Sequence, residues 1–455
     1  MKFQKRILKA HPATIMLVSF LLAITIGTLL LKLPFSTKSG HILWVDALFT
    51  STSAVCVTGL VVVDTGSYFT LFGQCVILLL IQIGGLGVMT ISVGLFRWIG
   101  KSISFRHRMV MQDVFAHTPR VDILNLVKST IFFTLGAEFI GAVFLTIHWS
   151  QTLSFPKAVY TAVFHSVSAF CNAGFSLFSD SLIQDSGNML LVFTICALIV
   201  VGGIGFPVLY DLQYWFRRRK TQRIKLTIQT KTVLVTTFFL IIIGTVMFAL
   251  LEEHPLQTGD SLIHRILIAL FQSITCRTAG FNTIDIASLR EATLALMIFL
   301  MFIGASPGSC GGGVKTTTLA LLGAFTISKM KGRIRVNMFR KSIPVEAVNR
   351  SISLILVSIC FIGIILFLLL VSESPGPNIS GKSGSFLSYL FETVSAFGTV
   401  GLSMGVTAYL GILGKIWLTV MMIIGRVGVL TFSYIIVGTG ATSGIEYSEE
   451  SIMIG

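Results

Sequence analysis

Four short segments of the chain share a pattern that could hold a monovalent cation. Each has a phenylalanine, a serine or threonine four residues later, and a glycine nine or ten residues after the phenylalanine. The segments read LFTSTSAVCVTGLVV (48–62), VFHSVSAFCNAGFSL (163–177), LFQSITCRTAGFNTI (270–284) and LFETVSAFGTVGLSM (390–404). No carboxylate flanks the glycines, which argues against a carboxylate ring of the calcium type. The chemistry on offer is coordination by bare backbone carbonyls, which can replace the water shell of a weakly hydrated cation.

The candidate cation-binding residues are each glycine and the two residues before it. Glycine adopts a positive φ at little cost and lets backbones approach closely, as a ring of inward-facing carbonyls requires. The third segment has one residue fewer between its phenylalanine and its glycine, so the register of that loop stays open. The candidates are Val57, Thr58, Gly59, Asn172, Ala173, Gly174, Thr278, Ala279, Gly280, Thr399, Val400 and Gly401.

A second unusual segment, GASPGSCGGGVKTTT (304–318), interrupts an apolar stretch. Its glycines and Pro307 cannot continue a straight helix. Such backbone at membrane depth must be buried in protein or line a cavity. It does not match a Walker A phosphate loop, because Val314 separates the last glycine from Lys315. A proline kink with no further role is the alternative interpretation.

The composition indicates which elements must position these residues. Of the 455 residues, 54% are hydrophobic and 12% are charged, whereas soluble domains carry roughly 25% charged residues. This excludes a soluble enzyme, a disordered chain and a collagen-like fibre, and it predicts an all-α polytopic membrane protein. The stretches long enough to cross a bilayer are 13–33, 69–97, 129–148, 188–212, 232–251, 292–304 with a broken continuation to about 328, 352–371 and 416–437.

A shorter apolar segment lies between the members of each pair of stretches. These segments, near 43–55, 158–170, 263–275 and 385–397, are too short to span and are predicted to be re-entrant pore half-helices. A half-helix that stops in mid-membrane directs the partial negative charge of its carboxyl end to the centre. We therefore expect four helix–half-helix–helix repeats around one central cation pore. The expected divisions are a cytoplasmic segment 1–12, repeats 13–110, 111–225, 226–340 and 341–440, and a cytoplasmic tail 441–455.

A glycine motif follows each candidate loop and supports the repeat. It reads IGGLGV (83–88), VGGIGF (201–206), IGASPG (303–308) and IGRVGV (424–429). Two aligned landmarks in four copies indicate a repeat architecture, and glycine-rich packing in an unrelated carrier is the alternative. Arg426 takes the place that glycine holds in the first two copies. A charge at membrane depth is costly and marks a functional candidate, with a structural ion pair as the alternative.

The basic residues define an orientation rather than a nucleic-acid surface. The net charge is +15. Four, six, seven and seven lysines and arginines lie in 1–12, 97–128, 217–231 and 329–350, which is 24 of the 34. The positive-inside rule then places both termini in the cytoplasm. The seven cysteines show no metal-binding spacing, so we expect neither a disulfide framework nor a zinc site.

These features resemble the Trk/Ktr/HKT superfamily of potassium transporters over essentially the whole chain, and its Ktr-type membrane subunit (KtrB) most. The resemblance implies potassium uptake through a gated, carbonyl-lined pore in a bacterial inner membrane, with sodium as a further candidate ion. Potassium at the filter carbonyls is then the substrate, with no tightly bound cofactor. The resemblance also assigns a gate, with an arginine as electrostatic barrier, to Gly304, Ala305, Ser306, Pro307, Gly308, Ser309, Cys310, Gly311, Gly312, Gly313, Lys315 and Arg426.

The resemblance further implies partners. It implies a homodimer and a cytosolic KtrA-like regulatory ring that binds ATP or ADP. No nucleotide-binding domain is recognised in the sequence, so a nucleotide sensor is expected on another chain. The basic segments 97–128, 217–231 and 329–350 and the tail 444–455 offer a docking surface. Anionic membrane lipid would favour the same basic segments, so both interpretations stay open. No nucleic-acid partner is expected.

The remaining polar residues within apolar segments are given structural roles. We expect Asp46 to cap the first half-helix. Arg277 and Glu392 are intramembrane charges that could pair with each other. His165 and His264 are predicted to be packed or interfacial rather than catalytic. No nucleophile lies beside a base in any segment, so the chain is not predicted to be an enzyme.

The rival function is a sodium- or proton-coupled secondary carrier of another small solute, built from broken helices. Carrier repeats commonly come as two related halves, whereas this chain has four copies in the same orientation. A lone buried carboxylate in mid-helix would favour proton coupling, and none is recognised in the sequence. A non-transporting membrane scaffold does not explain four re-entrant segments.

Overall fold

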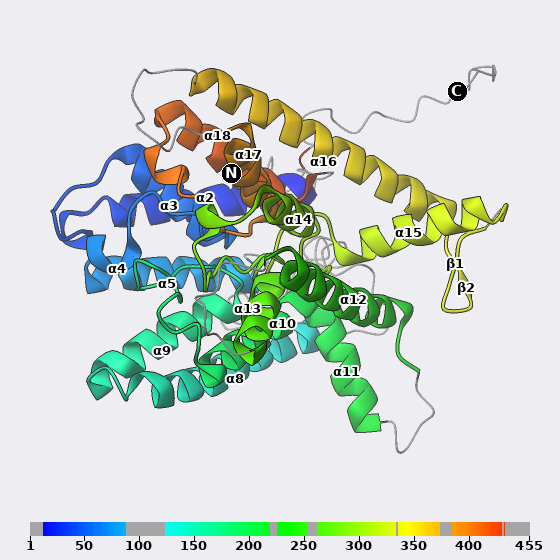
Figure 1. Cartoon of the computed structure of the whole chain (residues 1–455), viewed down its shortest axis with the longest axis horizontal. Coiled ribbons are helices and arrows are strands. Elements are labelled where there is room, and N and C mark those ends of the chain that lie inside the picture. The colour runs from blue at the N-terminus through cyan, green and yellow to red at the C-terminus, as the bar shows by residue number, and fades with distance from the viewer. Residues whose placement is uncertain are drawn as a thin grey trace, which may run out of the picture.

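Four successive groups of three helices make up most of the described chain (Figure 1). The computed structural model describes residues 12–87, 123–218, 225–252, 262–333, 335–373, 385–429 and 432. The groups are α2 (Pro12–Leu31), α3 (Trp44–Cys56) and α5 (Leu71–Leu86); α8 (Ile123–Trp149), α9 (Phe155–Phe170) and α10 (Met189–Ile204); α12 (Ile228–Leu251), α13 (Leu262–Thr275) and α14 (Glu291–Phe302); and α16 (Val345–Ser372), α17 (Phe386–Gly398) and α18 (Ile412–Val427).

The remaining elements lie between the helices of a group or follow its third helix. They are η1 (Pro34–Ser36), α4 (Thr65–Tyr68), α11 (Phe206–Arg218), η2 (Ile286–Ser288), α15 (Thr316–Met330), β1 (Asn337–Met338), β2 (Lys341–Ser342) and η3 (Thr407–Tyr409). The two strands pair antiparallel with Asn337 opposite Ser342, and they project beyond α15 at the right of Figure 1.

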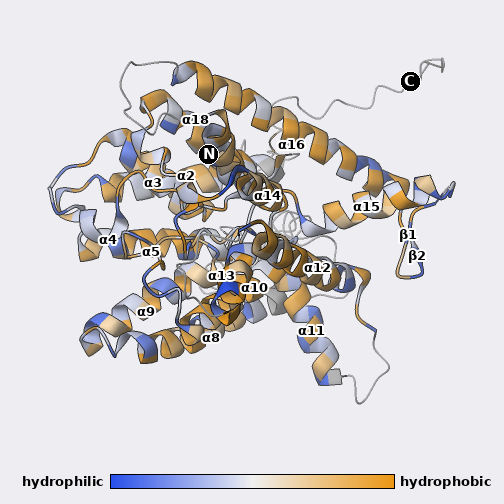
Figure 2. Ribbon diagram, in the orientation of Figure 1, coloured by the Kyte–Doolittle hydropathy of each residue, from blue (hydrophilic) through white to orange (hydrophobic). Residues whose placement is uncertain are grey.

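The first helices of the groups expose apolar side chains, whereas the second helices are largely buried. Within the described residues α8, α12 and α16 are each long and apolar enough to cross a membrane, and Figure 2 shows them mostly in the hydrophobic colour. Large apolar side chains project from them, such as Phe132 at 72% and Leu250 at 67% exposure. Each would cost about 1.5–3 kcal/mol in water, so these faces belong in lipid. The carboxyl-terminal parts of α3, α9, α13 and α17 are instead buried.

The groups pack in a closed cycle. The third helix of each group contacts the second helix of the next: α5 contacts α9, α10 contacts α13, α14 contacts α17, and α18 contacts α3. Each second helix also packs against the first helix of its own group. The second helices therefore lie inside the cycle, between the first and third helices.

The predicted span over 188–212 consists of two helices that meet at a sharp bend. Helix α10 ends at Ile204, and α11 continues from it at an angle of 95°. The bend is at Gly205, whose φ of +98° is a conformation that glycine adopts readily and other residues rarely do. A glycine inside an apolar run does not by itself predict a break, because isolated glycines are tolerated in helices.

The other third helices end at the same place in the glycine motif. Helices α5 and α18 are followed by Gly87 and Gly428, with φ of +80° and +97°. In the third group Pro307 takes this position, and the chain stays non-helical between α14 and α15. The break that the sequence indicated for the third group is therefore matched by a break after α10, and α5 and α18 end at the same position of the motif.

Some predicted features lie outside the described residues. These are the terminal segments 1–11 and 433–455, the continuation of the predicted span 69–97 beyond residue 87, and most of the basic segment 97–128.

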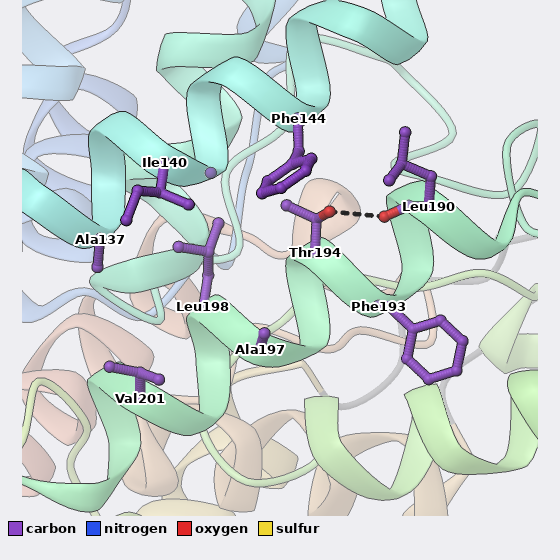
Figure 3. A pocket seen from close by; sticks show the side chains of 10 residues that line it. Ala137, Ile140, Phe144, Leu190, Phe193, Thr194, Ala197, Leu198 and Val201 are labelled. Carbon is purple, nitrogen blue, oxygen red and sulfur yellow. Dashed lines mark hydrogen bonds between the residues drawn. The ribbon is translucent and has the colours of Figure 1, made fainter.

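A groove between α8 and α10 offers no chemistry of its own (Figure 3). It has a volume of about 370 Å³ and is lined by apolar side chains such as Ile140, Phe144 and Phe193. The hydroxyl among its lining residues, Thr194 Oγ1, donates to Leu190 O at 2.6 Å. That hydroxyl is therefore already satisfied within the helix.

Candidate functional site

Each candidate loop begins with a left-handed backbone turn two residues before its glycine. The φ angle is 58° at Val57, 59° at Asn172, 74° at Thr278 and 49° at Thr399. A backbone held in such a sparsely populated region costs of order 1–3 kcal/mol, and strain of this kind clusters at functional sites. Asparagine is enriched in this conformation, so Asn172 indicates the turn in the sequence. The β-branched residues Val57, Thr278 and Thr399 rarely adopt it and give no such indication.

A positive φ returns at each glycine and not at the residue between. The values are 92° at Gly59, 68° at Gly174, 77° at Gly280 and 93° at Gly401. In a regular extended strand successive residues face opposite sides. Alternation in the sign of φ instead turns successive carbonyl groups toward one side, which is what coordination of a single ion requires.

The four glycines approach one another in a closed ring. A methyl group placed on Gly59 would lie 3.0 Å from Gly174 Cα, and one on Gly174 would lie 2.9 Å from Gly280 Cα. A methyl group on Gly280 would lie 3.3 Å from Gly401 Cα, and one on Gly401 would lie 2.9 Å from Gly59 Cα. All four distances are shorter than normal carbon–carbon contacts of about 3.5–4.0 Å. Close approach of backbones therefore requires glycine at each position.

The third loop occupies the same register as the others despite its missing residue. The shortening falls between Phe271 and Thr278, while the spacing from Thr278 to Gly280 equals that in the other loops. The backbone closes with Ala279 N donating to Thr275 O at 2.9 Å, a bond four residues back. The other three loops make the equivalent bond five residues back. The tighter closing turn absorbs the missing residue before the loop starts.

The serine or threonine four residues after each phenylalanine fastens its loop. In the first and fourth loops its hydroxyl accepts a bond from the glycine N–H, and in the other two it donates to the carbonyl just after the glycine. The bonds are Gly59 N to Ser53 Oγ at 3.1 Å, Gly401 N to Ser395 Oγ at 3.1 Å, Ser168 Oγ to Phe175 O at 2.8 Å and Thr275 Oγ1 to Phe281 O at 2.6 Å. This explains why the motif contains a hydroxyl at that spacing.

The interrupted segment between α14 and α15 is attached to the break after α10. Ser306 N donates to Gly203 O at 3.1 Å, and Phe206 N donates to Gly308 O at 3.0 Å. A methyl group on Gly205 would lie 2.6 Å from Pro307 O. The segment thus fills the space that the bend at Gly205 opens.

The middle of the segment faces the third and fourth loops directly. Gly312 N donates to Thr399 Oγ1 at 2.8 Å, and a methyl group on Gly311 would lie 2.8 Å from Thr278 Cβ. Lys315 Nζ donates to Gly311 O at 2.6 Å. The predicted gate residues and the predicted cation-binding residues are therefore neighbours in space.

Arg426 joins the segment to the first group. Its two terminal nitrogens donate to Cys310 O and to Gly84 O. Among the described residues no carboxylate pairs with it, and both recorded partners are backbone carbonyls. The guanidinium charge is therefore only partly compensated next to the segment.

The predicted pairing of Arg277 with Glu392 is wrong. Glu392 accepts bonds from the Ser403 and Thr407 hydroxyls, both at 2.6 Å. Arg277 Nη2 donates to Thr237 Oγ1 at 3.4 Å on α12. The two charges belong to different groups of helices, and each is served by hydroxyls of its own group.

The predicted capping role of Asp46 is also wrong. Helix α3 starts at Trp44 after Leu43, with no side-chain cap, and Asp46 lies in its first turn. Its carboxylate accepts a bond of 2.7 Å from Lys415 Nζ on α18. The pair holds the first half-helix against the last helix of the cycle. His165 is fully buried, as predicted for a packed residue.

Glu138 is a lone buried carboxylate in mid-helix, which the sequence analysis missed. It is 7% exposed on α8, and its carboxylate accepts a bond of 3.3 Å from Gln82 Nε2 on α5. Cys171 Sγ, at the start of the second loop, lies 3.9 Å from the other oxygen. Glu138 lies within the predicted span 129–148, where a single carboxylate does not disturb the hydropathy of a long apolar run.

Comparison with protein families and curated proteins gives concordant matches. The family model described as TrkH, a cation transport protein, matches residues 3–438. Ktr system potassium uptake protein B of Vibrio alginolyticus is 41% identical, covering 98% of this chain and 96% of that protein. Potassium/sodium uptake protein NtpJ of Enterococcus hirae is 38% identical, covering 99% of each. Ktr system potassium uptake protein B of Bacillus subtilis is 37% identical, covering 98% of this chain and 97% of that protein.

The fold is similar to a solved structure. The crystal structure of the potassium transporter TrkH from Vibrio parahaemolyticus matches with a TM-score of 0.69, covering 92% of this chain and 85% of that one. Its sequence identity of 19% supports a common fold.

Proposed function

The chain belongs to the TrkH family of cation transport proteins, and on this premise we propose that it is the membrane subunit of a Ktr-type system for potassium uptake. The observation that carries the proposal is the closed ring of four loop glycines, one after each short helix. Relatives at 41% and 37% identity bear names that state potassium uptake. A ring of bare carbonyls suits a weakly hydrated monovalent cation.

In this proposal the four groups of helices are repeats around one pore, and the twelve loop residues are its selectivity filter. The carbonyls of Thr58, Ala173, Ala279 and Val400 immediately precede the ring glycines and supply oxygen ligands. The carboxyl ends of α3, α9, α13 and α17 add partial negative charge at the same place. Potassium loses water and gains carbonyl oxygens as it enters.

The gate is the segment from Gly304 to Gly313 together with Lys315 and Arg426. A cation that leaves the ring meets the glycines that contact Thr278 and Thr399. It also meets the guanidinium of Arg426, which repels it. Passage requires the segment to withdraw, and its many glycines give it that freedom.

Further assignments follow from the relatives. The printed name of the 38% identical relative, a potassium/sodium uptake protein, supports sodium as a second ion. The words "Ktr system" in two relatives' names support a second component, which we propose is a cytosolic ring that binds ATP or ADP, beneath a dimer of this chain. The bacterial relatives support an inner-membrane location, and the basic segments support cytoplasmic termini.

The proposal is tested by cation flux into vesicles that hold the full chain alone, with potassium, rubidium, sodium and lithium compared at equal gradients. Potassium and rubidium are expected to pass and lithium to be excluded, because the smaller ion binds its water more tightly. Empty vesicles give the background. Equal flux of all four ions, or flux of none of them with and without a nucleotide-binding ring partner, would contradict the proposal.

Glu138 is the residue on which a second candidate function, proton-coupled transport, would depend. The carboxylate is buried in mid-helix, and such groups serve as proton relays in some transporters. Its contacts with Gln82 and Cys171 place it behind the second loop rather than in the ring, which favours a structural role. Potassium flux driven by a proton gradient alone would support coupling, and its absence would exclude it.

A further inference from the structure

A second set of contacts fastens the candidate loops beyond their glycines. In three of the four groups a polar side chain on the half-helix meets a hydroxyl eleven residues later in the chain. The pairs are His165 Nε2 with Ser176 Oγ at 3.0 Å, Gln272 Nε2 with Thr283 Oγ1 at 3.3 Å, and Glu392 Oε1 with Ser403 Oγ at 2.6 Å. All three half-helix side chains are fully buried.

The spacing of eleven residues is kept even where the loop differs in length. Each half-helix residue directly follows the phenylalanine of its motif. The third loop has one residue fewer before its glycine, and its hydroxyl partner, Thr283, comes one residue later after the glycine than Ser176 or Ser403 does. The residue missing before the glycine of the third loop is thus offset by an extra residue after it. The same contact across the loop is therefore made in all three groups.

The three contacts differ in strength. Glu392 accepts three bonds, because Met404 N donates to it at 3.0 Å in addition to Ser403 and Thr407. His165 Nδ1 lies 2.8 Å from the carbonyl of Thr161 and must carry the proton there, so Nε2 accepts from Ser176. Gln272 makes a single recorded bond to a hydroxyl. The fourth loop is therefore held most firmly after its glycine.

The first group lacks this contact. The residue after its phenylalanine is Thr50, whose hydroxyl is buried and has no hydrogen-bond partner among the described residues. Eleven residues later the chain has Val61, which cannot supply a hydroxyl and is 38% exposed. Of the two side-chain contacts that fasten the other loops, the first loop makes only the Ser53 bond to Gly59 N among the described residues. Its segment beyond the glycine is held less tightly than the other three.

We propose that His165, Gln272 and Glu392 are positioning residues, which fix the outer ends of three filter loops through the hydroxyls of Ser176, Thr283 and Ser403. The proposal rests on the filter function proposed above. Carbonyls held at a fixed spacing fit potassium and cannot close around a smaller cation. A loop released from its half-helix moves inward more easily and coordinates sodium better, so potassium preference falls.

The test uses the full chain in vesicles and measures the ratio of KM values for sodium and potassium. Removal of a hydroxyl by Ser403→Ala is expected to lower potassium preference about tenfold, because bonds to a carboxylate are the strong ones. The changes Ser176→Ala and Thr283→Val are expected to lower it about threefold each, as weaker neutral bonds are lost. The variant Ser403→Thr keeps a hydroxyl and is expected to restore most of the preference.

The chain supplies a matched control in its first group. Thr50→Val removes a buried hydroxyl at the equivalent half-helix position, but one without a partner, so the KM ratio is expected to stay unchanged. A ratio in Thr50→Val that falls as far as in Ser403→Ala would overturn the proposed difference between the first loop and the others. A lower unfolding temperature with an unchanged ratio in the three hydroxyl variants would show a purely structural role and overturn the positioning role.

A reference variant separates this proposal from the filter assignment. Gly401→Ser places a side chain inside the ring itself. If Gly401→Ser loses potassium preference while Ser403→Ala, Ser176→Ala and Thr283→Val all keep it, the positioning role is overturned and the filter assignment stands. If Gly401→Ser also keeps the preference, the filter assignment fails, and the proposal that rests on it is overturned as well.

Discussion

Two layers of the molecule can be compared, the four loops and the four third-helix ends beneath them. The loops are nearly equivalent, since each has a positive φ two residues before a glycine that joins the same ring. The helix ends are unequal. Three end at a single glycine with a positive φ, whereas α14 is followed by the non-helical segment that leads to α15. One of the equivalent glycine positions holds Arg426.

The difference separates two proposed roles, ion selection by the loops and gating at the helix ends. In the proposed function the ring selects the ion, and the four loops that form it have nearly the same backbone geometry. A gate needs only one element that can move, and an unequal part in a single group is sufficient. The contacts of the segment with Gly203 and Thr399, and of Arg426 with Gly84, link that single element to the other three groups.

Gly401→Ser breaks the upper layer and has the largest expected effect. Its side chain would collide with the Thr58 carbonyl and lie close to Gly59 Cα, so we expect the KM for potassium uptake to rise about 100-fold. Gly405→Ser is the matched control, because Gly405 has a similar φ of +85° but no atom within 4 Å of the added carbon. Equal effects of the two changes would show that backbone strain, not the ring, is responsible.

Deletion of residues 309–313 removes the unequal part of the lower layer. The bonds of Gly312 with Thr399 and of Lys315 with Gly311 disappear, and potassium flux in vesicles is expected to rise about tenfold if the open state is favoured by about 1.4 kcal/mol. Potassium preference over sodium should persist, because the ring is untouched. A lower flux in protein with an unchanged unfolding temperature would argue against a gate.

Arg426→Ala tests the charge in the lower layer and has a smaller expected effect. Loss of the guanidinium removes repulsion and the bonds to Cys310 and Gly84, and flux is expected to rise about threefold, a modest change for a partly compensated charge. Arg426→Lys keeps the charge and is expected to retain most of the barrier. Flux that falls together with the unfolding temperature in the alanine variant would indicate a structural arginine instead.

Gly205→Ala tests whether the bend between α10 and α11 is necessary. The added carbon would lie 2.6 Å from Pro307 O at a φ of +98°, so the free energy of unfolding is expected to fall by about 1–3 kcal/mol. Gly323→Ala is the control, because Gly323 lies within helix α15 with open space around it and alanine favours helix by about 1 kcal/mol. Similar stability of the two variants in thermal unfolding would contradict a required bend.

Glu138→Gln has the smallest expected effect. The amide keeps the size of the side chain, and its oxygen can still accept the bond from Gln82. Potassium flux is therefore expected to stay within about twofold of the unmodified protein. Flux is measured at several pH values on both sides of neutrality. A pH dependence that the unmodified protein shows and the variant lacks would instead make Glu138 part of a proton-coupled mechanism.

The half-helices could be predicted well from the sequence. The expected segment 263–275 agrees closely with α13 (Leu262–Thr275), and 385–397 agrees with α17 (Phe386–Gly398). The short apolar length and the repeated pattern of phenylalanine, hydroxyl and glycine predict these helices. The hydroxyl fastens the loop and the glycine allows close approach of backbones, so both residue types act locally. The bend at Gly205 could not be predicted in the same way, since it depends on Pro307 from another group packing against it.

Side-chain partners were the least predictable part of the site. Arg277 and Glu392 attract attention as opposite charges, yet hydroxyls of their own groups are their partners. Asp46 lies near a helix start, yet its partner, Lys415, is 369 residues away in the chain. Composition predicts which polar groups need partners within the membrane, and only the packing of the groups decides which partner each finds.

The proposed function requires that a potassium ion is coordinated inside the ring of four glycine loops. Crystals of the full chain soaked with thallium(I), a potassium-like cation with strong anomalous scattering, test this most directly. We expect an anomalous peak on the axis of the ring, next to the carbonyls of Thr58, Ala173, Ala279 and Val400, that weakens when potassium is added in excess. A peak only elsewhere in the molecule, or none while the soaked crystals still diffract, would show that the ring does not coordinate the ion.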